Sequence, residues 1–233
     1  MGAKEKPKRG GKRAGAGRKK TGMCRDVPHR ARPELDARHP VHVVVRMKKE
    51  RSIGLRRGRL YARMRKVIVR YLGRDDFRIV HLSIQQNHLH LLLEAISKRA
   101  LSRGMQSFTI NAARAINADH DSVGKVWEFR YHATQIRTAR QARNTLAYVL
   151  NNWRRHREDF ANGRLRDAKL DPYASGLALD GWNEKFLTPE GYTPLPVSSP
   201  QTRLLKTDWK RFGLLEPHEA PGPLALGGYQ RLL

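Results

Sequence analysis

Two histidines on one predicted strand are spaced so that they could bind a metal ion together. His88 and His90 flank a single leucine within the segment NHLHLLLEA. Successive side chains of a β-strand point to opposite faces, so both imidazoles are expected on one face, where they can reach one cation. Glu94 shares that face but lies further along the strand, which makes it a poor third ligand. The spacing by itself also fits a pair of ordinary surface histidines.

A later segment, predicted to be helical, carries a tyrosine and an asparagine away from its apolar stripe. Four apolar residues recur at helical spacing and form that stripe: Leu146, Val149, Leu150 and Trp153. Tyr148 and Asn152 are one turn apart and project together, roughly 130° from the centre of the stripe. Asn144, Asn151 and Arg155 are expected on the same polar side. The alternative is an amphipathic tyrosine that only covers the flank of the helix.

These residue types together suit one reaction class. A tyrosine phenol has a pKa of about 10 and is a poor nucleophile at neutral pH. A divalent cation on a phosphate neutralises charge and orients the phosphorus, which lowers the barrier to attack. A cation held by two imidazoles and an amide oxygen keeps positions open for phosphate oxygens. The pattern therefore fits phosphodiester cleavage through a phosphotyrosine link.

The elements that must position these residues follow the order β-α-β-β-α-β-α. Strands are predicted over 41–47, 77–85, 88–95 and 126–137. Helices are predicted over 54–73, over 99–120 and from the N-cap Thr138 onward. The first six elements match the split βαβ, ferredoxin-like pattern, an α+β fold with one antiparallel sheet and two helices on one face. The last helix, which carries Tyr148, is an addition.

Three segments resemble the REP-associated tyrosine transposases, relatives of the single-tyrosine HUH transposases of small insertion sequences. NHLHLLLEA resembles their HUH motif, VWEFRYHA their "lWq.rYh" segment, and LAYVLNN their "YI..N" helix. The resemblance covers roughly Pro40 to Arg157. It implies that Tyr148 is the nucleophile and that His88, His90 and Asn152 bind Mg²⁺ or Mn²⁺. It also implies single-stranded or hairpin DNA as the substrate, with a 5′-phosphotyrosine and a free 3′-hydroxyl as products.

The chain departs from this family pattern at one point. The family helix usually continues with "NP" after the asparagine, whereas this chain reads NNWRRH. Because no proline stops the helix there, we expect it to continue through Arg155 to about His156.

Composition points to the same kind of partner. The formal net charge is +26 over 233 residues, with a sequence pI of about 11.1, which favours a polyanion such as nucleic acid. No segment approaches the roughly 20 apolar residues of a membrane span. The single cysteine, Cys24, excludes an internal disulfide and suggests a reducing cytoplasm. The family resemblance implies that this is a bacterial cytoplasm, where the protein would associate with the nucleoid.

The chain divides into three predicted parts. Residues 1–36 read as a basic, disordered arm, residues 37–163 as the catalytic domain, and residues 164–233 as a loop-rich extension. Candidate DNA contacts in the arm are Lys12, Arg13, Arg18, Lys19 and Lys20. Those in the domain are Arg63, Arg65, Lys66, Arg70, Arg130, His132 and Arg155. Core or surface roles, rather than metal ligation, are expected for His42 and His81. Core and edge packing, rather than base stacking, is expected for Trp127, Phe129 and Tyr131, and Tyr173, Trp182 and Phe186 are expected to anchor the extension.

Two other functions remain open from the sequence. One is a nucleic-acid-binding protein with the same fold and an unused site, and the other is an RNA-binding accessory protein. The second explains the charge but not the histidine pair. The sequence does not decide between a monomer and a homodimer, or between a mobile element and a domesticated role.

Overall fold

The computed structural model describes residues 34–51, 54–156 and 169–222. The residues from Glu34 onward form one compact unit. The predicted basic arm lies outside the described residues up to position 33, and so do its five candidate DNA contacts. None of the helices in the described ranges has the length and apolarity that crossing a bilayer requires.

The predicted order of elements is confirmed. The four strands are β1 (Val41–Arg46), β2 (Phe77–Ile84), β3 (His88–Ala95) and β4 (His132–Gln135). The main helices are α1 (Gly58–Val69), α2 (Lys98–Asp119) and α3 (Ala139–Arg155). In the described ranges beyond α3, the helices are short: η2 (Gly176–Ala178), α4 (Arg203–Lys206) and η3 (Asp208–Phe212).

The sheet has the strand order β2-β3-β1-β4, and every neighbouring pair is antiparallel. This is the ferredoxin-like arrangement expected from the sequence. In the register, Val44 of β1 lies opposite His90, and Arg46 lies opposite His88. The sheet therefore brings β1 directly beside the histidine pair.

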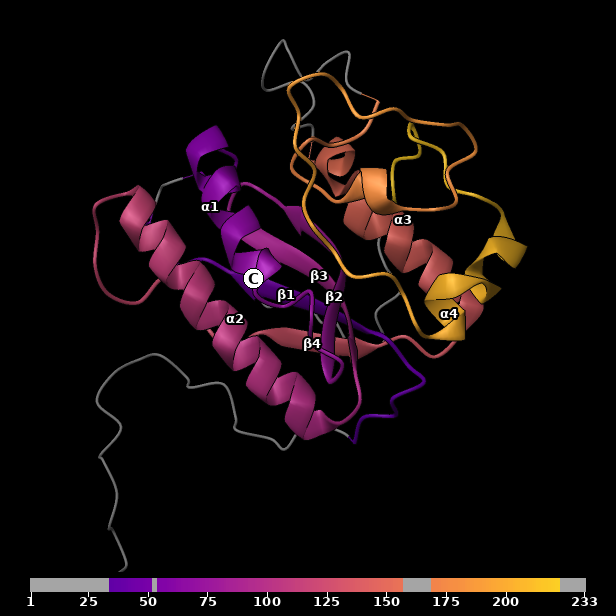
Figure 1. Ribbon diagram of the computed structural model, residues 1–233, viewed down its shortest axis with the longest axis horizontal. Coiled ribbons are helices and arrows are strands. Elements are labelled where there is room, and N and C mark those ends of the chain that lie inside the picture. The colour runs from indigo at the N-terminus through magenta and orange to yellow at the C-terminus, as the bar shows by residue number, and fades with distance from the viewer. Residues whose placement is uncertain (1–33, 52–53, 157–168, 223–233) are drawn as a thin grey trace, which may run out of the picture. The chain divides into compact units, whose positions relative to one another are not determined.

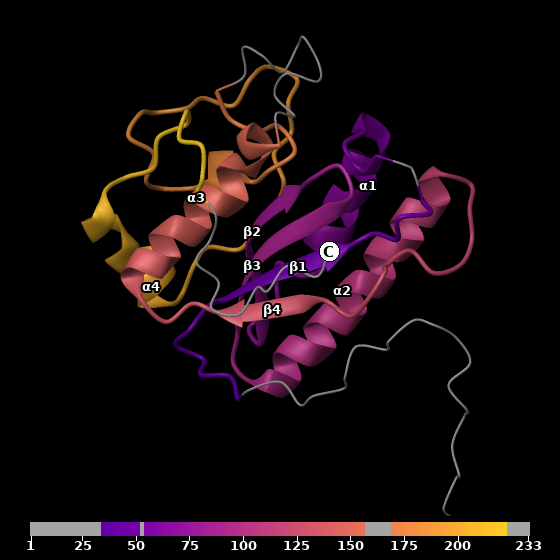
Figure 2. The same ribbon diagram turned by 180° about the vertical axis from the view of Figure 1, so that it is seen from behind.

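The helices divide between the two faces of the sheet. Figures 1 and 2 show α1 and α2 on one face and α3 on the other. Leu89, Leu91 and Leu93 belong to the core shared with α1 and α2, whereas Leu92 belongs to a second core with the α3 residues Leu146 and Leu150. The alternation of β3 thus buries both of its faces, and the face that carries the histidines is the one covered by α3.

Two predicted elements, the fourth strand and the first helix, are shorter in the structure than predicted. The strand predicted from Val126 begins only at His132, and before it Trp127 makes a single bridge to Met47. The Trp127 indole is buried and donates a 2.8 Å hydrogen bond to the Thr109 carbonyl of α2, so packing against α2 holds this part of the chain. The broken alternation leaves Phe129 54% exposed, against its expected packing role. In α1, the helix ends at Val69 and Leu72 is 41% exposed rather than part of the core stripe.

The helix α3 has the ends that its sequence predicts. The side chain of the N-cap residue Thr138 accepts from the Gln141 amide, and the helix continues to Arg155 with His156 as C-cap. Its apolar stripe packs on the sheet and on Trp209 of η3. Arg143 forms a two-pronged ion pair with Glu219, and Asn151 and Arg154 donate to the carbonyls of Glu216 and Pro217. Residues 209–219 therefore hold α3 from the side away from the sheet.

Candidate active site

β3 and β1 together build a cluster of three imidazoles. His88 and His90 share a face of β3, and their Nε2 atoms are 2.9 Å apart. His42 of β1 is buried, and its Nε2 atom lies 3.1 Å from Nδ1 of His90. The role predicted for His42 did not include this contact. His42 lies against His90, the ring that we expect to bind a cation.

Hydrogen bonds orient the two rings of β3. The side-chain oxygen of Asn87 lies 2.7 Å from Nδ1 of His88, where it is placed to accept from a protonated Nδ1 and to leave the lone pair of Nε2 facing the site. Nε2 of His42 is placed to accept from Nδ1 of His90, which leaves the lone pair of that Nε2 facing the same point. Metal-binding histidines are commonly oriented in this way by an acceptor behind the ring.

The three rings are held in the neutral form. Burial lowers the pKa of His42 to about 4 and that of His88 to about 3. Burial also puts the pKa of His90 well below its usual value, and the neighbouring His42 and His88 add to the effect. Neutral imidazole is the form that binds a metal ion, so at neutral pH no proton needs to leave before a cation binds.

α3 brings an amide to the same point. The side-chain amide of Asn152 is fully buried, and its nitrogen lies 3.0 Å from Nε2 of His90. Its oxygen, Oδ1, has no hydrogen-bond partner among the described residues. The two ends of an amide are interchangeable in such a placement, and a rotated Asn152 would direct that oxygen at the histidine nitrogens. An amide oxygen that serves as a cation ligand is expected to have no hydrogen-bond partner in the protein.

The spacing of these atoms fits one divalent cation. Nε2 of His90 lies 2.9 Å from Nε2 of His88 and 3.0 Å from the Asn152 amide. Adjacent ligands of an octahedral ion with bonds of about 2.1 Å are about 3 Å apart. In the described part of the chain, no three His, Cys, Asp or Glu side chains group as metal ligands. A cation here would therefore depend on the Asn152 amide and would carry its positive charge uncompensated by a carboxylate.

Tyr148 lies beside this cluster, one turn before Asn152. Its ring centroid is 5.2 Å from that of His90 and 5.9 Å from that of His42, and both pairs are edge-to-face. The Arg155 guanidinium carbon lies 5.8 Å from the centroid of the Tyr148 ring. Tyr148 is half-buried, so its ring contacts the imidazoles while part of it reaches solvent. Asn151, which was expected on this polar side, is instead buried and donates to the Glu216 carbonyl.

The predicted DNA contacts do not form one surface. Arg155, Arg130 and His132 are exposed, and Arg155 lies next to Tyr148. Arg63, Lys66 and Arg70 lie on α1 or its C-cap, across the sheet from the histidines. Arg65 donates a 2.8 Å hydrogen bond to the Pro194 carbonyl, so it serves the fold rather than an open surface.

Sequence reasoning missed the residues around the histidine pair. His42 and Asn87 orient the rings, and the His156 ring lies 5.9 Å from that of His88. The alternation of VHVVVRM places His42 opposite the apolar valines, which was a usable signal. The pairing register of β1 and β3, which places His42 beside His90, could not be predicted from that alternation.

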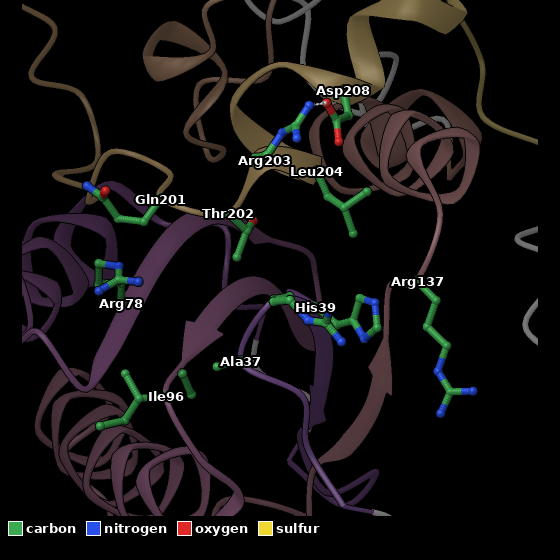
Figure 3. Close-up of a pocket in the computed structure, with 12 residues that line it drawn as sticks. Ala37, His39, Arg78, Ile96, Arg137, Gln201, Thr202, Arg203, Leu204 and Asp208 are labelled. Atoms are coloured by element: carbon green, nitrogen blue, oxygen red, sulfur yellow. Dashed lines mark ion pairs between the residues drawn. The ribbon is translucent and has the colours of Figure 1, made fainter.

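A pocket lies at the end of β3 away from the histidine pair (Figure 3). It has a volume of about 590 Å³ and is bounded by residues 37–39, the ends of β2 and β3, Arg137 and residues 201–204. Glu94 is buried beside it and accepts hydrogen bonds from Arg78 and from the backbone amides of Gln201 and Thr202. Glu94 is therefore engaged away from the histidines, in agreement with its exclusion as a ligand.

Comparison with known proteins identifies the family. The model of the IS200-like transposases matches residues 37–152. Residues 37–152 of this chain belong to the IS200-like transposase family. The matched residues of this chain include His88, His90, Tyr148 and Asn152. The transposase relationship predicted from the three motifs is confirmed.

Several solved structures are similar in fold. A REP-associated tyrosine transposase bound to a REP hairpin has 16% identity and a TM-score of 0.48, covering 64% of this chain and 83% of that chain. A proposed transposase from Deinococcus radiodurans R1 has 16% identity and a TM-score of 0.34, covering 59% and 97%. A bacterial tRNA(His) guanylyltransferase (Thg1)-like protein in complex with ATP has 12% identity and a TM-score of 0.38, covering 58% and 69%. Likenesses this distant do not distinguish one function from another. Comparison with curated proteins gave no match.

Proposed function

We propose that this transposase-family chain is a metal-dependent enzyme that cleaves and rejoins single-stranded or hairpin DNA through Tyr148. One observation supports the proposal above all. Two elements far apart in the sequence bring Nε2 of His90 within 2.9 Å of Nε2 of His88 and 3.0 Å of the Asn152 amide, and set the Tyr148 ring beside His90. The Asn152 amide oxygen is buried without a hydrogen-bond partner among the described residues, which leaves it available to a cation.

In this mechanism the residues have separate tasks. His88, His90 and Asn152 would hold Mg²⁺ or Mn²⁺, which when bound neutralises charge on the scissile phosphate. The Tyr148 oxygen attacks the phosphorus and loses its proton to solvent, the bond to the 3′ oxygen breaks, and that oxygen gains a proton. The products are a 5′-phosphotyrosine and a free 3′-hydroxyl. Attack by a 3′-hydroxyl on the phosphotyrosine reverses the step and joins strands. Arg155, beside the Tyr148 ring, is placed to pair with a neighbouring phosphate.

The proposed substrate is a folded palindrome of the REP type, in a bacterial cell where the protein stays with the nucleoid DNA. The motif resemblance to the REP-associated tyrosine transposases motivates this choice. The net charge of +26 supports strong attraction to phosphate backbones. Bases that are unpaired in loops and mismatches would supply specificity, because their edges are accessible.

A covalent trapping assay tests the proposal. Labelled hairpin DNA from the flanking genome is incubated with the protein and Mn²⁺, and the products are separated under denaturing conditions. We expect a protein–DNA band that disappears with EDTA and in Tyr148→Phe. Tyr61→Phe, which removes a hydroxyl on α1 across the sheet, is the matched control and should retain the band.

The outcomes separate the candidate functions. A band that persists in Tyr148→Phe would contradict the assignment of the nucleophile. Binding of every hairpin without any covalent band would favour the nucleic-acid-binding protein with an unused site. Preferential binding of RNA, again without a band, would favour the RNA-binding alternative.

A further inference from the structure

Arg46 is a cation beside the candidate active site whose charge the proposed mechanism does not use. It is the last residue of β1 and lies directly opposite His88 in the antiparallel register. Directly opposed residues of such a pair have their side chains on the same face of the sheet. The neighbours Val45 and Met47 belong to the core under α1 and α2. Arg46 therefore faces the other way, toward α3 and the proposed cation ligands.

The electrostatics of the site agree with this placement. Burial lowers the pKa of three histidines, and the positive charge of Arg46 adds to the effect at each of them: His88, His90 and His156. Arg46 is exposed, and its guanidinium has no hydrogen-bond or ion-pair partner among the described residues. Its charge is thus available to a ligand that reaches the histidines.

Backbone hydrogen bonds fix the position of Arg46. Its carbonyl accepts a 3.0 Å hydrogen bond from the Glu128 amide, and the next residue, Met47, donates a 2.9 Å bond to the Asn87 carbonyl. The side chain of Asn87 is also the one that orients His88. The same short stretch of backbone therefore sets the positions of both the His88 ring and the Arg46 side chain.

The flank of the histidine pair toward β4 is accessible to solvent. Val44 lies opposite His90 in the sheet and is only half-buried, and its partner on the other side, His132 of β4, is exposed. The proposed cation ligands come from β3 and α3. Phosphate oxygens that complete the coordination of such a cation would therefore approach over β1, where Arg46 lies.

The charges at the site favour an anion in this position. The three proposed ligands are uncharged, so a divalent cation and Arg46 would repel each other until an anion joins them. A guanidinium binds phosphate oxygens through parallel N–H bonds. During attack by Tyr148 the nonbridging oxygens of the phosphate carry negative charge, and a fixed donor beside them stabilises it.

We propose that Arg46 binds a nonbridging oxygen of the scissile phosphate and holds that phosphate against the histidine pair. The inference rests on the proposed function, from which it takes the substrate and the reaction. Arg46 keeps its proton throughout and forms no covalent bond. Its role differs from that of Arg155, which lies beside the Tyr148 ring and is placed for a neighbouring phosphate.

The first experiment measures DNA binding without cleavage. In the Tyr148→Phe background and in EDTA, fluorescence anisotropy gives the affinity for a labelled hairpin with an unpaired flank, with and without Arg46→Gln. Lys185→Gln, which removes an exposed cation of the C-terminal extension, is the matched control. In a series of further hairpins, each phosphate of the flank is replaced in turn by a neutral methylphosphonate.

We expect Arg46→Gln to weaken binding of the unmodified hairpin about tenfold, the cost of one charge-assisted hydrogen bond. On the hairpin that is neutral at the cleaved linkage, Arg46→Gln should have no further effect, because the partner of Arg46 is already missing. Lys185→Gln should bind every hairpin as Tyr148→Phe does. An Arg46 effect that persists on all the hairpins, or that disappears at a linkage other than the cleaved one, would overturn the proposal.

Failure of the proposed function would show separately. It would appear as the absence of a covalent band from the wild type, in an assay that does not involve the Arg46 variant. The phosphate contact of Arg46 would still be tested in that case, by whether its effect on affinity maps to a single linkage.

A second experiment separates a phosphate contact from a structural role. Without DNA, Arg46→Gln should bind Mn²⁺ about threefold more tightly in a calorimetric titration, since a like charge is removed. With hairpin DNA, its covalent band should form about 100-fold more slowly, a usual cost of losing one transition-state donor. Arg46→Lys should recover part of that rate. Weaker binding of Mn²⁺ by DNA-free Arg46→Gln would mean that Arg46 supports the histidine pair instead, which would overturn the proposal.

Discussion

At the scale of single residues, the candidate site depends on the hydrogen-bond acceptors that orient the His88 and His90 imidazoles. Asn87 and His42 sit behind His88 and His90, so that the Nε2 atoms face one point. Both supporting residues are uncharged, as are the three proposed ligands. The charge of Arg46, which after burial helps to lower the pKa of His88 and of His90, is positive, so among nearby groups a substrate phosphate would supply the negative charge that a bound cation needs. The site is thus better matched to a cation together with DNA than to a cation alone.

Replacement of His42 should weaken cation binding without touching a ligand. In His42→Ala, Nδ1 of His90 loses its acceptor, and loss of such an outer partner typically costs about 10–100-fold in metal affinity. His42→Gln can still accept from His90 and should lose less. Calorimetric titration with Mn²⁺ measures the effect, with circular dichroism to verify folding. An unchanged affinity in folded His42→Ala would show that His42 does not position His90.

At the scale of elements, α2 is set against the sheet by a residue with no side chain. A Cβ built on Gly104 would lie 2.2 Å from the Phe77 ring. Phe77 is fully buried at the start of β2. The glycine that weakens the helix on propensity grounds is therefore required by close packing.

Gly104→Ala should destabilise the protein although alanine is the better helix former. The propensity gain is about 1 kcal/mol, whereas forcing Phe77 aside in a packed core costs about 1–3 kcal/mol. We expect a net loss of about 1 kcal/mol in urea unfolding. Gly58→Ala, at a helical glycine with no atom within 4 Å of its added Cβ, is the control and should be neutral or stabilising. A more stable Gly104→Ala would mean that Phe77 relaxes without cost.

The elements were predictable because their signals are local, and the contacts between them were not. Periodicity indicated the strands and helices, and the cap residue Thr138 marked the start of α3. The position of His42 depends on strand register, which no local pattern sets. The partners of α3 in residues 214–219 are separated from it by about 65 residues or more. The start of β4 was predicted too early because Trp127, which has the sequence pattern of a strand residue, packs on α2.

At the scale of the whole molecule, folding buries several neutral histidines in a strongly basic chain. His81 is buried beside Ser175, and burial lowers its pKa from 6.5 to about 4. Below pH 6.5 the unfolded chain binds a proton at this position that the folded chain does not. The contribution of His81 to stability is therefore complete above pH 6.5 and declines as the pH falls toward 4.

The stability of the wild type should approach that of His81→Gln in acid. The shift at His81 corresponds to up to about 3 kcal/mol between pH 7 and pH 4. Urea unfolding of both proteins at pH 7, 5.5 and 4.5 measures the difference, and the other titrating groups largely cancel in it. Parallel dependences on pH would show that His81 does not stay neutral in the folded protein.

The hydrogen bonds between α3 and residues 216–222 also constrain which sequence changes evolution can accept there. Asn151, Arg154 and Arg155 donate to the backbone carbonyls of positions 216, 217 and 222. A carbonyl is present whichever amino acid occupies the position, so substitutions there keep the acceptors in place. A deletion shifts every acceptor along the helix. Among homologous chains, positions 216, 217 and 222 are expected to vary in residue type, whereas Glu219, whose side chain pairs with Arg143, and the length of the stretch are expected to be conserved.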